Sequence, residues 1–433
     1  MYVIPKKSVH LTNYYHKDSG GISTAYNHLL DAANRHERFV TLIVPGTSDE
    51  TLSIGKFGKI HFVEAKPFPL FDKRYRTLLP QTYLFEGAKV REILLSEMPD
   101  LIEICDKYTL SWLAGMIRIG KFRKLGRPLL LHLSCERMDD NVRAYVSDSK
   151  IGKWISKQVM RNFIYPMFDY YSANSNYTMG ELTDSMGNAR KKNDLPMFPK
   201  WCWKRFEASN SEVSQRSFIN ECGVDTSMFD SSKRSVAAKQ ELHDSLGLPL
   251  NATTILYAGR LSPEKNVHIL GDVLLLLRRS PDNDFKLIIA GDGPSKDKLE
   301  KKLKSIAPDS YRFVGHLTEK SDLANLYANV DVFIHPNPRE PFGIGPLEAM
   351  SSGTPVVAPR SGGILSYCND NNSWLVDGSP ESFANSIFEI LAFPDSTHKR
   401  VENALINAKS RTWENATDNI FLNYDQMIAD FGT

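Results

Sequence analysis

Short, continuously apolar runs alternate with helix-like stretches along most of the chain, and this alternation limits the folds it can adopt. The runs FVTLIVPG (39–46) and RPLLLHL (127–133) show almost no alternation between apolar and polar residues. Such runs are typical of strands that are buried on both faces of a parallel sheet, with helices as the crossover connections. The scheme of strand, turn and helix restarts near residue 250, in 252–279 and again in 284–306. Two such series predict an α/β protein with two doubly wound, parallel-sheet domains.

The polar stretch 217–249 separates the two series and gives the domain boundary. We expect residues 1–225 to form the first domain and residues 226–410 the second. The final segment also has the character of a helix, and we expect its last part, 411–433, to lie apart from the second sheet. A chain of 433 residues is long enough for two or three domains.

Composition excludes several classes of protein. The 53 Lys and Arg residues balance the 51 Asp and Glu residues, so we expect no nucleic-acid partner. The five cysteines are scattered and form no Cys-x-x-Cys pair, which argues against a disulfide framework and against a zinc site. The first residues contain no apolar stretch typical of a signal peptide, and no apolar run is long enough to span a bilayer. We therefore expect a cytoplasmic protein.

Candidate anion-binding residues follow predicted strands, where doubly wound sheets bind their ligands. Arg260 and Lys265 belong to the turn after the first strand of the second series (GRLSPEK), and two cations in such a turn suit a diphosphate. Gly20 and Gly21 follow an N-terminal strand and open a helix, where backbone amides can approach an anion. The alternatives are a solvated surface turn for the two cations and an ordinary helix start for the two glycines.

Two carboxylates surround a glycine-rich bend in residues 339–363 (REPFGIGPLEAMSSGTPVVAPRSGG). Glu340 precedes the bend, and Glu348 follows it on the predicted helix. A carboxylate close to a cluster of backbone amides can accept hydrogen bonds from sugar hydroxyls. One glutamate could hold the hydroxyls of a donor sugar and the other those of a ribose. The alternative, a helix cap and a surface glutamate, does not account for the whole spacing.

These motifs together resemble the retaining glycosyltransferases of the GT-B fold, in particular family 4, the group 1 glycosyltransferases. The resemblance covers nearly the whole chain and is strongest over 252–378. The second half contains the family's motifs in order and spacing: GRLSPEK, LIIAGDGP, FVGHL, DVFIHPNPREPFGIGPLEAMSSGTPVVAPRSGG and WLVDG. In the first half, SGGIST, SANSNYT and INECGVDTSMF match as well.

The resemblance implies a retaining hexosyltransferase, which moves a hexose from a UDP- or GDP-linked sugar to a hydroxyl acceptor, with a lipid or a glycan among the candidate acceptors. It implies two Rossmann-like domains that face a cleft, with a helix in 411–433 crossing back to the first domain. Neither a metal ion nor a cofactor is expected, and the Asp-Asn-Asp at 282–284 is interpreted as a turn before a strand. The alternatives are a non-catalytic protein that binds sugar nucleotides and a GT-B sugar-nucleotide epimerase.

The resemblance also implies roles for individual residues. Arg260 and Lys265 would bind the diphosphate of the donor. Glu340 would contact the donor sugar, and Glu348 would accept the ribose hydroxyls. Further residues would lie beside the sugar or the phosphates: Gly20, Gly21, Phe342, Gly343 and Ile344.

The strand at 127–133 departs from the family pattern, which commonly has a histidine just after this strand. Cys135 occupies the histidine position in the loop comparison, whereas His132 lies within the strand. His132 is our candidate for a contact with the donor sugar, and a buried strand histidine is the alternative. Three further residues could face the acceptor or form surface pairs instead: Asp106, Glu136 and Arg137.

A basic and aromatic segment, 190–206, is the second departure from the family pattern. It contains six basic residues, interleaved with Phe198, Trp201, Trp203 and Phe206. Lysine and arginine beside tryptophan resemble a membrane-interface patch, and an ordinary amphipathic loop near the hinge is the alternative. On the first interpretation the protein would be peripheral at the inner face of the membrane.

Overall fold

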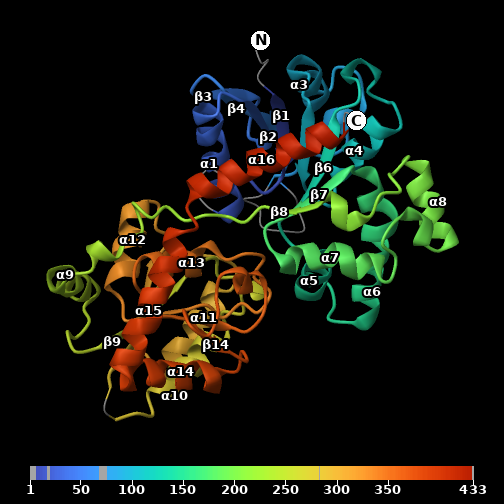
Figure 1. The fold of residues 1–433 in the computed structure, drawn as a ribbon. Coiled ribbons are helices and arrows are strands. Elements are labelled where there is room, and N and C mark those ends of the chain that lie inside the picture. Colours follow the sequence, from blue (N-terminus) through green and yellow to red (C-terminus); the bar gives the residue numbers. More distant parts are fainter. Residues whose placement is uncertain (1–5, 17–19, 68–75, 282, 432–433) are drawn as a thin grey trace. The chain divides into compact units, whose positions relative to one another are not determined.

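The computed structural model describes residues 6–16, 20–67, 76–281 and 283–431, and the chain divides into two compact units (Figure 1). Unit 1 comprises Met1–Glu221 and Ala416–Thr433, and unit 2 comprises Cys222–Asn415. Unit 1 is therefore discontinuous along the chain, because its last segment follows the whole of unit 2. Each unit is a doubly wound α/β sheet, as the alternation of strands and helices predicts.

Among the described residues, the sheet of unit 1 has eight strands in the order β3-β4-β2-β1-β5-β6-β7-β8. Neighbouring strands are parallel except β3 and β4, which are antiparallel. The strands are β1 (Lys7–Thr12), β2 (Phe39–Gly46), β3 (Glu50–Ile54), β4 (Gly58–Glu64), β5 (Leu101–Cys105), β6 (Leu129–Ser134), β7 (Tyr170–Ala173) and β8 (Ser217–Ile219). The α-helices are α1 (Gly21–Arg35), α2 (Gln81–Leu84), α3 (Lys89–Glu97), α4 (Ser111–Arg118), α5 (Met138–Tyr145), α6 (Lys150–Val159), α7 (Asn176–Met186), α8 (Met197–Arg205) and most of α16 (Trp413–Phe431).

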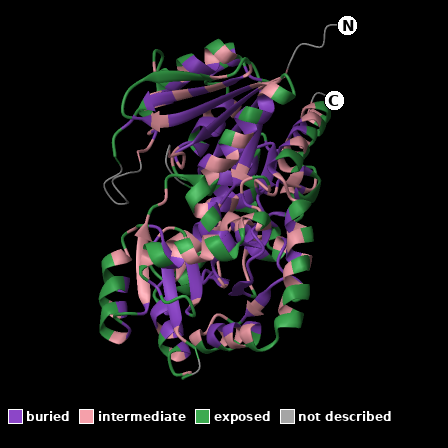
Figure 2. Ribbon diagram, turned by 90° about the vertical axis from the view of Figure 1, so that its left-hand side faces the viewer, coloured by how far each residue is buried: buried purple, intermediate pink, exposed green. Residues whose placement is uncertain are grey.

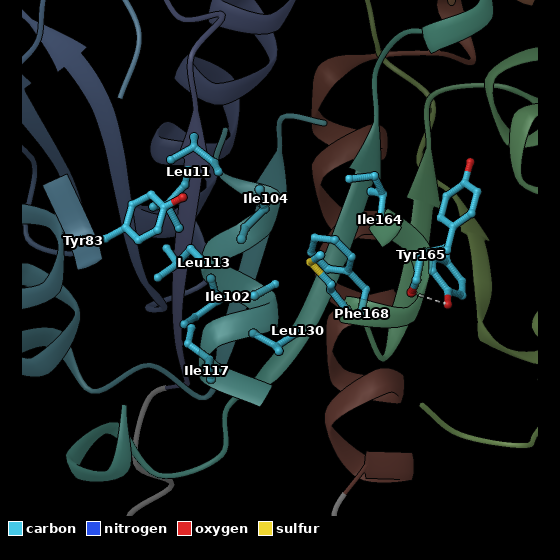
Figure 3. Packing of buried hydrophobic residues seen from close by; sticks show 14 of the residues in the cluster. Leu11, Tyr83, Ile102, Ile104, Leu113, Ile117, Leu130, Ile164, Tyr165 and Phe168 are labelled. Atoms are coloured by element: carbon cyan, nitrogen blue, oxygen red, sulfur yellow. Dashed lines mark hydrogen bonds between the residues drawn. The ribbon is translucent and has the colours of Figure 1, made fainter. Parts of the chain in front are cut away.

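The core of unit 1 lies on both faces of its sheet. In β5, Ile102 and Ile104 belong to one buried cluster, whereas Leu101 and Cys105 belong to another. Alternate residues of a strand point to opposite faces, so both faces of β5 are covered. Figure 2 shows most of the sheet as buried, and Figure 3 shows Ile104 beside Leu11 of β1, with Ile102 further along β5. This double coverage explains why the strand sequences are continuously apolar.

Among the described residues, the sheet of unit 2 has six parallel strands in the order β11-β10-β9-β12-β13-β14. This is the Rossmann order, and it reverses between β9 and β12. The strands are β9 (Thr253–Ala258), β10 (Phe285–Ala290), β11 (Tyr311–Gly315), β12 (Val332–Ile334), β13 (Val356–Pro359) and β14 (Trp374–Val376). The α-helices are α9 (Val236–Leu246), α10 (Ile269–Leu277), α11 (Lys296–Ile306), α12 (Lys320–Asn329), α13 (Ile344–Ser351), α14 (Pro380–Ala392) and α15 (Pro394–Lys409).

Three glycines allow the turns after β9 and β10 to approach each other closely. A Cβ atom on Gly291 would lie 1.9 Å from the carbonyl oxygen of Gly259, and one on Gly293 would lie 2.3 Å from that of Leu261. The turns extend the parallel pairing beyond the strands, since the amide of Gly259 donates to the carbonyl of Ala290 at 2.9 Å. The AGDGP turn (290–294) is thus a packing motif that fixes the backbone beside the turn containing Arg260.

Helix α16 packs on the sheet of unit 1 through apolar and polar contacts. Phe421 and Met427 are buried in the same cluster as residues of β2 and β5. The hydroxyl of Tyr424 donates to Oε2 of the buried Glu103 at 2.7 Å, and Arg38 pairs with Asp425. The end of the chain therefore completes the core of the domain that begins it. Within the described ranges, no helix has both the length and the apolar character needed to cross a bilayer.

Candidate functional site

The reversal of strand order in unit 2 brings together two loops that are far apart in the sequence. Strands β9 and β12 are hydrogen-bonded neighbours, with Phe333 opposite Leu256. Their carboxyl ends lead into the loops that carry Lys265 and Glu340. The Nζ atom of Lys265 lies 2.7 Å from Oε2 of Glu340, so the structure joins two of the predicted site residues in an ion pair. Ligands of doubly wound sheets bind at such a switch point.

Glu340 is a buried carboxylate, only 8% exposed, with several polar neighbours. Besides Lys265, the side chain of Asn337 donates to Oε2 at 2.9 Å, and Nε2 of His335 lies 3.4 Å from the same oxygen. Burial opposes ionisation of Glu340, but the charge of Lys265 and the contact with His335 hold its pKa well below the usual range. The carboxylate is therefore ionised at neutral pH and oriented by three partners.

Two glycines beside Glu340, Gly343 and Gly362, have little room for a side chain. Gly343 has φ 90° and precedes α13, and a Cβ atom there would lie 2.8 Å from Cγ2 of Ile364 and 3.1 Å from Cγ of Glu340. Gly362 has φ 83°, and its Cβ atom would lie 3.1 Å from the backbone nitrogen and oxygen of Glu340. The amide of Gly363 donates to the carbonyl of Glu340 at 2.6 Å. The two glycine segments thus hold the backbone of Glu340 between them.

The bend leads directly into α13, which begins at Ile344. The first amides of a helix have no partner within the helix and favour anions, so this helix start suits a phosphate group. The ring of Phe342 lies in the core, 2% exposed and 5.2 Å from the ring of Tyr367. Phe342 therefore supports the bend from inside, whereas Ile344 is partly exposed.

Glu348 lies one helical turn beyond the start of α13 and is partly buried. Burial raises the pKa of Glu348 to about 7, although Lys320 and a hydrogen bond with Tyr327 act in the opposite direction. Near neutral pH both the protonated and the ionised form of this carboxyl group are thus populated. It can donate as well as accept hydrogen bonds, which suits the hydroxyls of a ribose.

Arg260 follows β9 after one intervening residue, Gly259, and is partly exposed. Its carbonyl oxygen accepts a hydrogen bond from the hydroxyl of Tyr257 at 2.8 Å, which fixes the backbone of the turn. Arg260 thus lies in the same connection as Lys265, at the carboxyl end of the strand next to β12.

The predicted site residues of unit 1 lie in two environments. Gly20 has φ 108° and precedes α1, which begins at Gly21, and both glycines are exposed. His132 is buried in β6, with its ring 5.8 Å from that of Tyr165 and 5.0 Å from that of Phe168. Burial, together with the charge of Lys107, lowers the pKa of His132 to about 3. This environment favours the alternative of a neutral core histidine, and the contacts of all three residues with a donor remain predictions.

The predicted acceptor-side residues are held in polar networks at the carboxyl ends of β5 and β6. Asp106 accepts hydrogen bonds from the amides of residues 108–110, and it stabilises the start of α4. Arg137 pairs with Asp139 and Asp184. Glu136 accepts a hydrogen bond from the hydroxyl of Tyr14 at 2.8 Å and is partly exposed. Of the three predicted residues, Glu136 is the one with part of its surface accessible.

His335 and Asn337 contact Glu340 but were not among the site residues predicted from the sequence. Both belong to the polar run that follows β12 (HPN, 335–337), so their position after a buried strand was the available signal. Asp282, the first residue of the candidate Asp-x-Asp, lies outside the described residues. Within the described part of the chain, no group of three or more His, Cys, Asp or Glu side chains is arranged to hold a metal ion.

The segment 190–206 contains helix α8, and its aromatic residues have different roles. Trp203 is fully buried and its indole donates to the carbonyl of Arg161 at 2.8 Å, and Phe206 packs against the core. Phe198 and Trp201 are 54% and 60% exposed, and their rings stack at 6.2 Å. Two of the four aromatic residues therefore pack inside unit 1, and the other two are accessible at the surface.

The chain has relatives among proteins of known activity and among solved structures. Residues 238–406 match the family model for glycosyl transferases group 1. The chain is 27% identical over 411 residues to the GDP-mannose-dependent alpha-(1-6)-phosphatidylinositol dimannoside mannosyltransferase of Mycobacterium tuberculosis, covering 94% of this chain and 93% of the relative. Two solved structures share the fold. Sucrose-phosphate synthase from Thermosynechococcus elongatus has a TM-score of 0.71 at 19% identity, covering 98% of this chain and 100% of that chain. Anabaena Alr3699/HepE in complex with UDP-glucose has a TM-score of 0.66 at 19% identity, covering 97% and 99%.

Proposed function

For this chain, a group 1 glycosyltransferase with the GT-B fold, we propose that the reaction is the retaining transfer of a mannosyl group from GDP-mannose to a hydroxyl group of a glycolipid. The observation that carries the proposal is the ion pair of Lys265 with the ionised Glu340, at the switch point of the sheet in unit 2. The sequence left UDP- and GDP-linked donors open. The M. tuberculosis relative, which matches nearly the whole chain, is a GDP-mannose-dependent mannosyltransferase of a phosphatidylinositol dimannoside, and this favours GDP-mannose and a glycolipid.

Donor binding follows from the charges and amides of the site. Arg260 and Lys265 would bind the diphosphate, with the first amides of α13 on another side. Glu340 orients Lys265, because the two groups form a partly buried ion pair. The remaining lone pairs of Glu340 would accept the hydroxyls of the sugar, and Glu348 would bind the ribose.

The chemical step needs stabilisation of the leaving group. The bond between the sugar's C1 and the diphosphate oxygen breaks, and a bond from C1 to the acceptor oxygen forms on the same face of the sugar. The proton of the acceptor hydroxyl passes to an oxygen of the leaving phosphate. Cations and helix amides that are already oriented stabilise the negative charge that develops on GDP. This scheme uses neither a protein nucleophile nor a metal ion.

The predicted cytoplasmic location, peripheral at the inner membrane face, fits a glycolipid acceptor. In 190–206, the exposed Phe198 and Trp201 lie beside the exposed Lys200 and Lys204, which supports a contact with lipid. Trp203 and Phe206 do not contribute to such a contact, because they are needed for packing.

The test compares donors and a conservative variant. We expect GDP and GDP-mannose to raise the thermal unfolding temperature of the protein, and UDP and UDP-glucose to leave it nearly unchanged. Glu340→Gln keeps the shape of the side chain but removes its charge. We expect this variant to lose about 100-fold or more in transfer rate while still binding GDP. Glu300→Gln, on the exposed face of α11, is the matched control and should transfer normally.

Two results would contradict the proposal in different ways. A thermal shift with UDP alone would show that the donor nucleotide is UDP and not GDP. Binding of GDP-mannose without transfer to any glycolipid and without hydrolysis would show a non-catalytic protein.

A further inference from the structure

Helices α5 and α6, which are consecutive in unit 1 (Figure 1), expose several large apolar side chains. We name this the α5–α6 surface, and its members are Tyr145 (46% exposed), Val146 (79%), Ile151 (70%), Trp154 (61%) and Ile155 (48%). Single exposed apolar residues are normal on a protein surface, but a group of this kind within eleven residues indicates an interaction site.

The apolar side chains of α6 form one stripe, distinct from the face that packs on the core. Ile151, Trp154 and Ile155 have the spacing i, i+3 and i+4, so they lie on one side of the helix. Ser156 is buried on another side, and the helix continues into the buried Met160. The outward stripe is thus not required by the fold of unit 1.

Positive charge borders this stripe. Residues 143–161 contain five cations and one carboxylate, Asp148, which pairs with Arg143 at 2.9 Å. Lys150 and Lys153 are exposed and directly precede Ile151 and Trp154. Because neighbouring residues on a helix differ by about 100°, the lysines form a second stripe beside the apolar one. The surface therefore offers apolar area together with an excess of positive charge.

We propose that the α5–α6 surface docks on a membrane that contains anionic lipids, with α6 lying in the plane of the interface. Helices of this kind bury aliphatic and tryptophan side chains at the boundary of the acyl chains, while lysines contact the negative head groups. A second copy of this chain is a poorer occupant, since pairing two identical surfaces would bring lysine stripes together. The inference rests on the proposed function in one respect: the purpose assigned to docking is access to a glycolipid acceptor.

The experiment measures binding of the full-length protein to vesicles by co-sedimentation. Vesicles of phosphatidylcholine alone are compared with vesicles that also contain phosphatidylglycerol, at low and high salt. We expect binding to the anionic vesicles, weakened by salt. The double variant Ile151→Ser/Trp154→Ser should lower the partition coefficient by at least about tenfold, because two large apolar side chains no longer enter the interface. The variant Lys150→Gln/Lys153→Gln should lose most of the preference for anionic lipid.

Two control variants define the surface. Ile406→Ser changes a side chain of α15 in unit 2 that is 69% exposed, and it should leave vesicle binding unchanged. Trp201→Ser tests α8, and we expect a smaller loss than from the α6 double variant. The thermal shift given by GDP, measured for every variant, shows that the donor site is intact.

Several outcomes would overturn the inference. These are no binding of the unmodified protein to anionic vesicles, equal binding to neutral vesicles at all salt concentrations, or normal binding by the α6 double variant. Loss of binding from Trp201→Ser with normal binding by the α6 variant would assign the contact to 190–206 instead. A protein that transfers mannose but binds no vesicles would overturn the docking surface alone. One that binds vesicles through α6 but transfers nothing would overturn the proposed function alone.

Discussion

At the scale of single residues, the site depends on a glycine whose replacement would displace a charged group. Gly343→Ala would place a Cβ atom 2.8 Å from Ile364 and 3.1 Å from Glu340, at φ 90°. We expect a loss of roughly 2–4 kcal/mol in the free energy of unfolding, from the positive φ and from overpacking together. Urea denaturation would measure this loss, and transfer activity should fall more than the stability alone explains.

Gly378→Ala is the matched control for this prediction. Gly378 also lies in unit 2, with φ 93°, but a Cβ atom there would have no neighbour within 4 Å. Its replacement should therefore have only the conformational cost of about 1–2 kcal/mol. Equal losses from the two substitutions would show that the space around Gly343 is not restrictive.

Glu348 should make the stability of unit 2 depend on pH. Its pKa is raised to about 7 in the folded protein, whereas an unfolded chain loses the proton near pH 4.3. Between these values the folded state binds more protons, so this group lowers the free energy of unfolding as pH rises and has no further effect above about pH 7. Glu348→Gln removes the effect. Relative to the unmodified protein, we expect the free energy of unfolding of the variant to increase by up to about 3 kcal/mol as pH rises from 5 to 8.

Urea denaturation of both proteins at the two pH values tests this prediction. Glu300→Gln is again the control, because this exposed residue should give the same difference at both pH values. A difference between Glu348→Gln and the unmodified protein that does not change with pH would contradict the raised pKa.

At the scale of secondary-structure elements, α16 is attached to unit 1 by a buried carboxylate. Burial opposes the charge of Glu103, yet His10 and the hydroxyls of Tyr26 and Tyr424 hold its pKa below the usual value. Tyr424→Phe would remove the hydrogen bond of 2.7 Å to Oε2 and leave that oxygen buried. We expect a loss of about 1–3 kcal/mol and faster proteolysis of α16.

Leu422→Ala is the control for α16, since this side chain is 65% exposed on the same helix. It should change the free energy of unfolding by less than about 0.5 kcal/mol. If both variants unfold at the same urea concentration, the hydrogen bond to Glu103 does not hold the helix.

The elements also show how far sequence reasoning reaches. The apolar runs predicted the parallel sheets correctly, because only a sheet that is covered on both faces needs strands such as β5. The sequence placed Lys265 and Glu340 after separate strands, but the neighbourhood of β9 and β12 is a property of the sheet order. The role of His335 and Asn337 depends on this neighbourhood, so neither residue could be recognised from its own surroundings in the sequence.

Exposure of apolar side chains is the property that the sequence reveals least. Trp201 and Trp203 are two residues apart on α8, and one is 60% exposed whereas the other is fully buried. Ile151, Trp154 and Ile155 have the spacing of a core-facing stripe, although they point to solvent. Only the packing of the whole unit decides which stripe is covered.

At the scale of the whole molecule, the discontinuity of unit 1 predicts the effect of a truncation. Removing residues 416–433 deletes most of α16, which buries Phe421 and Met427 in unit 1. We expect unit 1 to lose several kcal/mol of stability, because two large apolar side chains leave the core. The stabilisation of unit 2 by GDP should persist, since the residues of its site lie in 222–415.

Calorimetry with and without GDP measures both parts of this prediction. In the truncated protein, one transition should move to lower temperature, and the transition of unit 2 should still respond to GDP. An unchanged first transition would show that α16 is dispensable for unit 1. Loss of the GDP response would show that the site needs unit 1 in its native form.

The position of α16 has a consequence for synthesis on the ribosome. Domains of most multidomain proteins fold in the order in which they emerge, the N-terminal one first. Here residues that complete the first domain are translated after the whole of the second domain. The apolar face of the nascent first domain that later receives Phe421 and Met427 therefore stays uncovered until α16 has been synthesised. Apolar surface that is exposed in this way favours aggregation until the domain is complete.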